Sequence, residues 1–267
     1  MAAALSPPAR LAGFVGEQAL GFVDEARELY SVFARTLYFC IRGKREPGAT
    51  LRQMYAIGNK SLLFLTVTMG CIGMILVYQA GLQTRRVVPD FSLLGATYLE
   101  LLVRDLAASL GSLMLATRVG AGIAAEIGSM VVTEQVDALR MCAADPIDYL
   151  VVPRFLASLV MTAVLIVWVG MVAFVAGALT AFVAFDVPLA TFANASLLDW
   201  GDLITGSLKC IAYGAAIPIV SGHAGLSTFG GSEGVGWATT KAVVSSSLAV
   251  IVLNLVISAA TFVIFPK

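Results

Sequence analysis

The feature that most constrains the fold of this chain is a set of five long segments that are almost free of charge. They cover residues 61–81, 93–117, 150–184, 203–222 and 243–265. About 20 mostly apolar residues are enough for a helix to cross a lipid bilayer. The sequence therefore predicts an all-α polytopic membrane protein with five transmembrane helices, although Arg104 and Asp105 interrupt the second segment.

Composition excludes several classes of protein. Of the 267 residues 59% are hydrophobic and 13% are charged, whereas a soluble domain has roughly 45–50% apolar and about 25% charged residues. The 17 basic and 17 acidic residues cancel, so no basic face indicates a nucleic-acid partner. One His and four scattered Cys show no metal-ligand spacing, and we expect no metal, no cofactor and no catalytic residue.

Lys and Arg in the short loops predict the orientation in the membrane, because they are enriched on the cytoplasmic side. Residues 1–60 hold eight of them, and the connection at 185–202 holds none. The N-terminus is therefore predicted inside, on the same side as 118–149 and 223–242, and the C-terminus outside. Two basic residues, Arg85 and Arg86, oppose the rule.

Residues 9–42 precede the first apolar segment and have apolar residues at helical spacing, interrupted by charges. We expect an amphipathic helix that lies in the membrane interface on its apolar face. The alternative is a helix packed on the rest of the protein. No signal-peptide pattern is evident in this region.

A short amphipathic helix is also predicted at about 131–143, between the second and third apolar segments. Thr133 is its expected N-cap, and one face is apolar while the other carries Glu134, Asp137 and Arg140. Asp145-Pro146 is a second helix-start signal, a capping residue followed by Pro at the first helical position. The helix is either a surface for a partner protein or an ordinary connection.

Two sequence blocks resemble a known family. The string GAGIAAEIGSMVVTEQVDALRMCAADPIDYLVVPR, residues 120–154, resembles the signature of MlaE/YrbE-type permeases, the transmembrane subunits of ABC-type lipid transporters that act with MCE-domain proteins. GGSEGVGWATTKAVVSSSLAV, residues 230–250, resembles the glycine-rich loop that leads into the family's last span. The resemblance runs from about residue 50 to the end, and the whole chain, 1–267, is predicted to be one permease domain with its transmembrane region at 61–265.

The resemblance implies an assembly. Such permeases have an interfacial helix and five spans, form homodimers in the bacterial inner membrane, and bind two ABC ATPase subunits through coupling helices. Here that helix would be 131–143, with Glu134, Gln135, Asp137 and Arg140 in contact with the ATPase. A hexamer of MCE-domain subunits meets the periplasmic side, and a cavity in the dimer holds phospholipid. The resemblance leaves open whether a small cytoplasmic regulatory subunit is also present.

Four residues are the expected lipid site: Arg104, Asp105, Lys209 and Asn254. A charge inside the membrane costs at least about 2.5–3.5 kcal/mol without a partner or water. Neighbours on a helix do not face each other, so Arg104 and Asp105 need different partners. Either these charges line a polar cavity and contact the lipid headgroup, or they form structural ion pairs such as Asp105 with Lys209, and the two readings are compatible.

The sequence departs from the family pattern at this site. The usual Arg-Glu-Leu-Gly-Pro of the second span is Arg-Asp-Leu-Ala-Ala at 104–108, and an acidic residue common in the last span is Asn254. Both changes concern the lipid site more than the fold. Together they predict a less acidic cavity that suits an anionic lipid.

Two other classes of function remain open. An ion-coupled secondary transporter of a hydrophobic or amphiphilic substrate would use the intramembrane charges for coupling, but five spans without an inverted repeat argue against it. A membrane-embedded enzyme needs a nucleophile with its base, or a metal, and none is found. The GGSEGVG loop lacks the Gly-Lys-Ser/Thr of a phosphate-binding loop, so ATP hydrolysis is expected on a separate chain.

Overall fold

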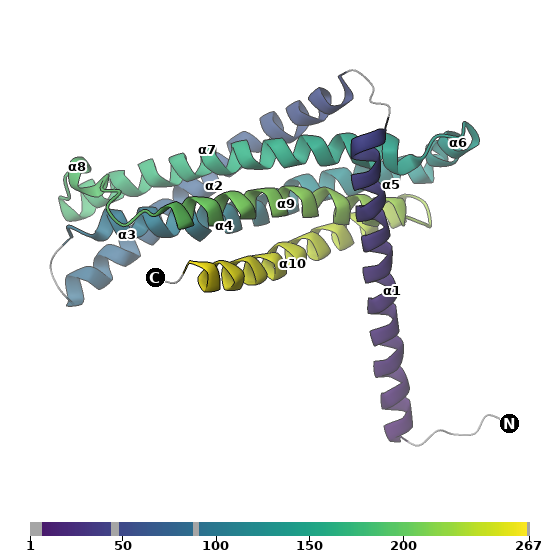
Figure 1. Cartoon of the computed structure of the whole chain (residues 1–267), viewed down its shortest axis with the longest axis horizontal. Helices are drawn as coiled ribbons and strands as arrows, with labels where there is room; N and C mark the ends of the chain where they lie inside the picture. Colours follow the sequence, from purple (N-terminus) through teal and green to yellow (C-terminus); the bar gives the residue numbers. More distant parts are fainter. Residues whose placement is uncertain (1–6, 44–47, 88–90, 266–267) are drawn as a thin grey trace.

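The computed structural model describes residues 7–43, 48–87 and 91–265. Five helices are long and apolar enough to cross a membrane, and they run side by side in one bundle (Figure 1). This confirms the predicted all-α membrane fold, and each helix extends past its predicted apolar segment at one or both ends. The spans are α2 (Ala49–Val87), Leu94–Val132, Ile147–Phe185, α9 (Trp200–Leu226) and α10 (Ser232–Ile264).

Two of the spans contain π-helical turns, labelled η. The second span consists of α3 (Leu94–Leu101), η1 (Leu102–Leu106), α4 (Ala107–Leu115), η2 (Ala116–Gly120) and α5 (Ala121–Val132). The third consists of η3 (Ile147–Val151) and α7 (Val152–Phe185), and α8 (Leu189–Phe192) follows in the next connection. π turns are rare and are frequent at functional sites. Here η1 holds Arg104 and Asp105, and η2 holds Arg118.

Small residues allow the spans to approach closely, as is usual where helices pack in lipid. A Cβ atom on Gly73 of α2 would lie 2.5 Å from the carbonyl oxygen of Ala173 in α7. The Tyr98 hydroxyl donates a hydrogen bond of 3.1 Å to that same oxygen. The first three spans therefore meet at one point around Ala173.

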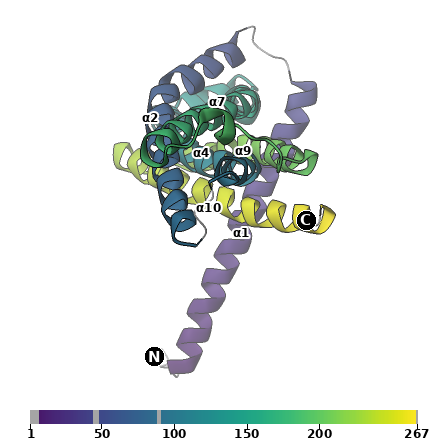
Figure 2. The ribbon, with the colours of Figure 1, turned by 90° about the vertical axis from the view of Figure 1, so that its left-hand side faces the viewer.

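A helix is present over the predicted residues 9–42, as α1 (Pro7–Arg42). It runs across the direction of the spans, at the end of the bundle that carries α6 (Figures 1 and 2). Val32 and Thr36 are buried against the bundle, whereas Leu37 and Ile41 are exposed. An apolar face that points away from the bundle suits contact with lipid, and the interfacial position stays a prediction.

Ion pairs fix α1 to the bundle. Glu25 contacts Lys241 of α10 at 2.7 Å, and Arg35 pairs with Asp145 before the third span. The Nε2 of His223 lies 3.7 Å from Glu28. Glu25 and Glu28 of α1 therefore face the ends of α10 and α9.

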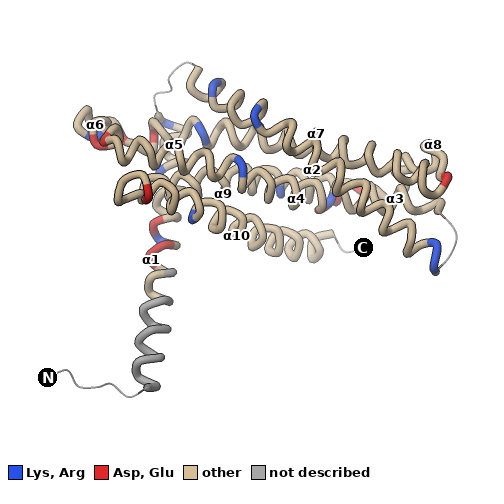
Figure 3. Tube along the Cα trace, turned by 180° about the vertical axis from the view of Figure 1, so that it is seen from behind, with Lys and Arg blue, Asp and Glu red and all other residues tan. Residues whose placement is uncertain are grey.

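One end of the bundle gathers the segments predicted to lie inside. The start of α2, the α5–α7 connection and the α9–α10 turn are all found there (Figure 1), and Figure 3 shows most Lys and Arg of the spans towards that end. We call it the α6 end. Gly230 and Gly231 have φ of +83° and +79°, so these glycines make the turn tight. Lys44, Arg45 and the C-terminal residues 266–267 lie outside the described residues.

Candidate functional site

Asp105 and Lys209 form an ion pair between the second span and α9. The Lys209 side chain is 1% exposed and that of Asp105 is 41% exposed. The Ser109 hydroxyl, one turn further along, donates to the same carboxylate at 2.8 Å. The predicted structural pair is therefore present, and it leaves part of the carboxylate accessible.

Asn254 joins the last span to this pair. Its Oδ1 accepts hydrogen bonds from the Tyr213 hydroxyl at 3.0 Å and from Ser258 at 3.4 Å. Its side chain also lies close enough to the Asp105 carboxylate to interact with it. An amide can accept and donate at once, whereas an ionised carboxylate only accepts. Asn254 thus connects Tyr213 to Asp105 in a way that a carboxylate could not.

Arg104 has a different partner, as its position next to Asp105 predicts. Its guanidinium lies 3.7 Å from Asp202, which is 3% exposed, whereas Arg104 is 27% exposed. Asp202 also accepts a hydrogen bond from the backbone N–H of Asp199 and completes a capping box at the start of α9. The structure therefore brings three of the four expected lipid-site residues into one network and places Arg104 beside it. We call Arg104, Asp105, Lys209 and Asn254 the charged cluster.

Local structure explains why these groups meet. The π turn η1 contains both Arg104 and Asp105. These neighbouring residues pair with two different residues of α9, Asp202 and Lys209. Gly206 lets α9 approach the second span, because a Cβ at that position would lie 2.4 Å from the Val103 carbonyl oxygen. Any larger residue at position 206 would separate Lys209 from Asp105.

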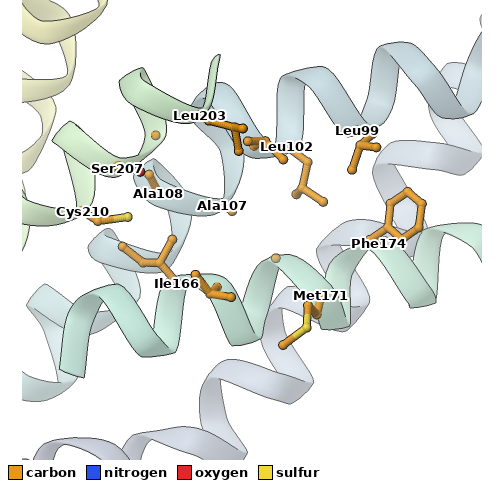
Figure 4. Close-up of a pocket in the computed structure, with 14 residues that line it drawn as sticks. Leu99, Leu102, Ala107, Ala108, Ile166, Met171, Phe174, Leu203, Ser207 and Cys210 are labelled. Carbon is orange, nitrogen blue, oxygen red and sulfur yellow. The ribbon is translucent and has the colours of Figure 1, made fainter. Parts of the chain in front are cut away.

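An apolar cavity of about 360 Å³ lies next to the charged cluster, between the second span, α7 and α9 (Figure 4). Val103 and Ala107, which flank the charged residues of η1, belong to its wall. Aliphatic and aromatic side chains form most of the rest, including Leu99, Leu102, Ile166, Met171, Phe174 and Leu203. An apolar cavity of this kind can hold a hydrocarbon chain. The residues of the charged cluster beside it can pair with ionic or hydrogen-bonding groups. The arrangement fits an amphiphile.

The short helix at the α6 end differs in part from its prediction. It is α6 (Gln135–Met141), shorter than 131–143. The prediction of Thr133 as N-cap is wrong, because its hydroxyl donates back to the Ser129 carbonyl at 2.8 Å and closes α5. Glu134 occupies the N-cap position with φ of +59° and makes no side-chain cap. The sharp turn separates α6 from α5.

The polar face of α6 is open. Val136 is buried and anchors the helix, while Glu134, Gln135, Asp137 and Arg140 are exposed. Arg140 and Asp137 contact each other at 3.0 Å. The second start signal is confirmed, because the Asp145 carboxylate accepts a hydrogen bond of 2.9 Å from the Ile147 N–H.

Sequence reasoning missed three functional candidates. Asp202 and Tyr213 complete the network of the charged cluster, and the buried Arg154 pairs at 2.9 Å with Glu126, whose side chain is 49% exposed. The opposite charges of Glu126 and Arg154 lie 28 positions apart on different spans, so only the fold shows that they meet. Within the described parts of the chain no group of three or more His, Cys, Asp or Glu could hold a metal ion.

The fold and the site together define a multi-pass membrane protein whose helix bundle encloses paired charges beside an apolar cavity. Comparison with known proteins gives its family. The model of the MlaE permease family matches residues 50–260, and the chain belongs to that family.

Several relatives agree. The chain is 36% identical to a probable ABC transporter permease protein of Synechocystis over 82% of this chain and 83% of the relative. It is 32% identical to the intermembrane phospholipid transport system permease protein MlaE of Haemophilus influenzae, over 79% and 82%. It is 33% identical to the chloroplastic protein TRIGALACTOSYLDIACYLGLYCEROL 1 of Arabidopsis thaliana, over 83% of this chain and 64% of that protein.

Proposed function

We propose that the chain is the transmembrane permease subunit of an ABC-type phospholipid transporter that acts with MCE-domain protein and moves lipid between the inner and outer membranes. Family membership supports the permease role. The observation that carries the lipid assignment is the charged cluster beside the apolar cavity. A phospholipid needs a polar site such as the charged cluster for its headgroup and an apolar cavity for an acyl chain.

The four residues of the charged cluster divide the work of binding. Arg104, which is 27% exposed, donates charge-assisted hydrogen bonds to the lipid phosphate, whereas Lys209, which is 1% exposed, supports the site from behind Asp105. Asp105 balances Lys209 when no lipid is bound, which limits the cost of an empty site. Asn254 holds Asp105 and Tyr213 in place without adding a negative charge.

Two other surfaces serve partners in this proposal. The exposed residues of α6, Glu134, Gln135, Asp137 and Arg140, contact ABC ATPase subunits, which hydrolyse ATP. The permease forms a homodimer, and a hexamer of MCE-domain subunits covers its outer end. A small regulatory subunit on the ATPase is compatible with this arrangement.

The proposed location is the bacterial inner membrane, with the N-terminus cytoplasmic and the C-terminus periplasmic. The excess of Lys and Arg in residues 1–60 supports this orientation. In this orientation the α6 end faces the cytoplasm, where the ATPase would bind, and the charged cluster lies nearer the periplasm.

The test is transport by the native complex, purified through a tag on this chain and reconstituted with fluorescent phospholipid. We expect the ATPase and the MCE-domain protein to co-purify, and transport to require ATP. Arg104→Ala should lower bound lipid and transport severalfold while the complex stays assembled, and the control Arg104→Lys, which keeps the charge, should lose less. Transport by the isolated chain under a proton gradient would instead establish a secondary transporter.

A further inference from the structure

A second polar site lies at the α6 end of the bundle, away from the charged cluster. It is a cleft of about 150 Å³ between α2 and the second span. We call it the inner cleft. Its lining includes the polar and small residues Gln53, Lys60, Ser61, Arg118, Gly122 and Glu126. Arg118 is 13 residues from Asp105 on the same span, or about 20 Å at 1.5 Å per residue. The two sites are therefore separate.

The inner cleft carries uncompensated positive charge. Lys60 and Arg118 are both exposed, and among the described residues neither has an ion-pair or hydrogen-bond partner. Glu126, the acid of the cleft, is already paired with Arg154 at 2.9 Å. Arg154 is 4% exposed and also donates to the Leu150 carbonyl. The charge of Glu126 is thus neutralised by Arg154. The cations Lys60 and Arg118 therefore have no acidic partner in the inner cleft.

The depth of the two cations in the bundle indicates what they meet. Lys60 directly precedes the apolar run 61–81, and Arg118 directly follows the largely apolar α4 and the start of η2. Both therefore lie where the hydrocarbon part of the bilayer gives way to headgroups at the α6 end. Arg118 is also placed by a π turn, a feature that is frequent at functional sites.

We propose that the inner cleft binds an anionic phosphate group, with the Lys60 ammonium and the Arg118 guanidinium as its donors. An Arg fork and a Lys point charge are both suited to phosphate oxygens. The phosphate belongs either to the headgroup of a lipid in the leaflet at the α6 end or to inorganic phosphate. The proposal does not depend on the charged cluster, on ATP or on the partner subunits.

The test uses the purified, delipidated full-length chain in detergent. Native mass spectrometry counts bound phosphatidylglycerol, and calorimetry measures inorganic phosphate. The variant Lys60→Gln/Arg118→Gln should lose one phosphatidylglycerol per chain, or bind it about tenfold more weakly, because two charge-assisted contacts are removed. The control Arg85→Gln/Arg86→Gln removes the same charge at the other end of the bundle and should bind as the wild type does.

A second variant tests the cleft without changing charge. A Cβ on Gly122 would meet only a guanidinium nitrogen of Arg118, at 3.9 Å, so Gly122→Leu fills the cleft and leaves the helix packing unchanged. It should weaken phosphate binding as the double variant does, whereas Gly236→Leu, at a position with nothing within 4 Å, should not.

The results also distinguish the source of the phosphate. Loss of phosphatidylglycerol alone would assign the cleft to lipid, and loss of inorganic phosphate binding alone would assign it to the free anion. Unchanged binding of both probes in Lys60→Gln/Arg118→Gln would overturn the proposal. None of these outcomes depends on transport, so the proposed function stands or falls separately.

Discussion

Lys209, almost completely buried in α9, directs its ammonium group at the carboxylate of Asp105, which remains 41% exposed on the second span. The pair is thus sealed on its cationic side and open on its anionic side. Such a geometry joins the second span to α9 and leaves the carboxylate edge of the pair accessible to a ligand. The interpretation of these charges as a structural ion pair and their interpretation as part of a lipid site therefore concern the same two side chains.

The first prediction concerns the stability of this pair. Lys209→Met leaves Asp105 without its main partner, and removing one member of a buried pair is more costly than replacing both by apolar residues. We expect Lys209→Met to lower the Tm of the purified protein by about 5–10 °C. Lys209→Met/Asp105→Leu should regain at least half of that loss. Equal Tm values for the single and double variants would show that the two residues are not energetically coupled.

The second prediction concerns Asn254. Asn254→Asp replaces the amide that interacts with Asp105 by a second acid. Two carboxylates then face each other near the proposed position of the lipid phosphate, and like charges repel. We expect binding of anionic phosphatidylglycerol to fall severalfold while zwitterionic phosphatidylethanolamine is less affected, as measured by lipid co-purification. Asn254→Leu, which loses the hydrogen bonds without adding charge, is the matched control and should not discriminate between the two lipids.

The third prediction concerns the apolar cavity. Gly170 of α7 lines it, and a Cβ there would lie 3.5 Å from the Cβ of Ala107, an ordinary contact. Gly170→Ala should therefore be tolerated, whereas Gly170→Leu fills the space proposed for an acyl chain. We expect transport in proteoliposomes to fall at least fivefold in Gly170→Leu with an unchanged Tm. Wild-type transport in the filled variant would remove the cavity from the lipid path.

The five spans could be predicted from the sequence because membrane thickness sets a minimum apolar length that no loop satisfies. The separate partners of Arg104 and Asp105 could also be predicted, since neighbours on a helix point in different directions. Asp202 could not be predicted as the partner of Arg104, because nothing local links residues 98 positions apart. The π turn at η1, which sets where both charges point, likewise has no local sequence signal.

At the start of α6 the Thr133 hydroxyl has two possible hydrogen-bonding roles, and the sequence does not decide between them. Thr133 has the chemistry of an N-cap, but its hydroxyl can equally donate to the carbonyl four residues earlier. The second arrangement is the one formed, with Ser129 as the acceptor. Glu134 then adopts the left-handed conformation that the turn requires. The predicted helix is present, but its N-cap and both of its ends differ from the prediction.

The fourth prediction concerns the position of α1. Ile41 is 81% exposed on the face of α1 that points away from the bundle, whereas Asp24 is an exposed polar position on the same helix. In an otherwise cysteine-free protein in native membranes, Ile41→Cys should react slowly with a charged maleimide because lipid shields it. Asp24→Cys should react at least fivefold faster. Comparable rates at both positions would contradict an interfacial α1.

The last prediction concerns α6. Glu134 and Asp137 are exposed acids on a helix that Val136 anchors to the bundle, so their side chains are available to a partner without supporting the fold. Glu134→Lys/Asp137→Lys changes the charge of this surface by four units, which repels a partner whose surface complements acidic groups. We expect at least tenfold less ATPase in pull-downs through the tagged permease, with normal membrane insertion and an unchanged Tm. The neutral pair Glu134→Gln/Asp137→Asn should lose less, because it removes attraction without adding repulsion. If the charge-reversed permease keeps wild-type ATPase binding and transport, α6 is only a connection between two spans.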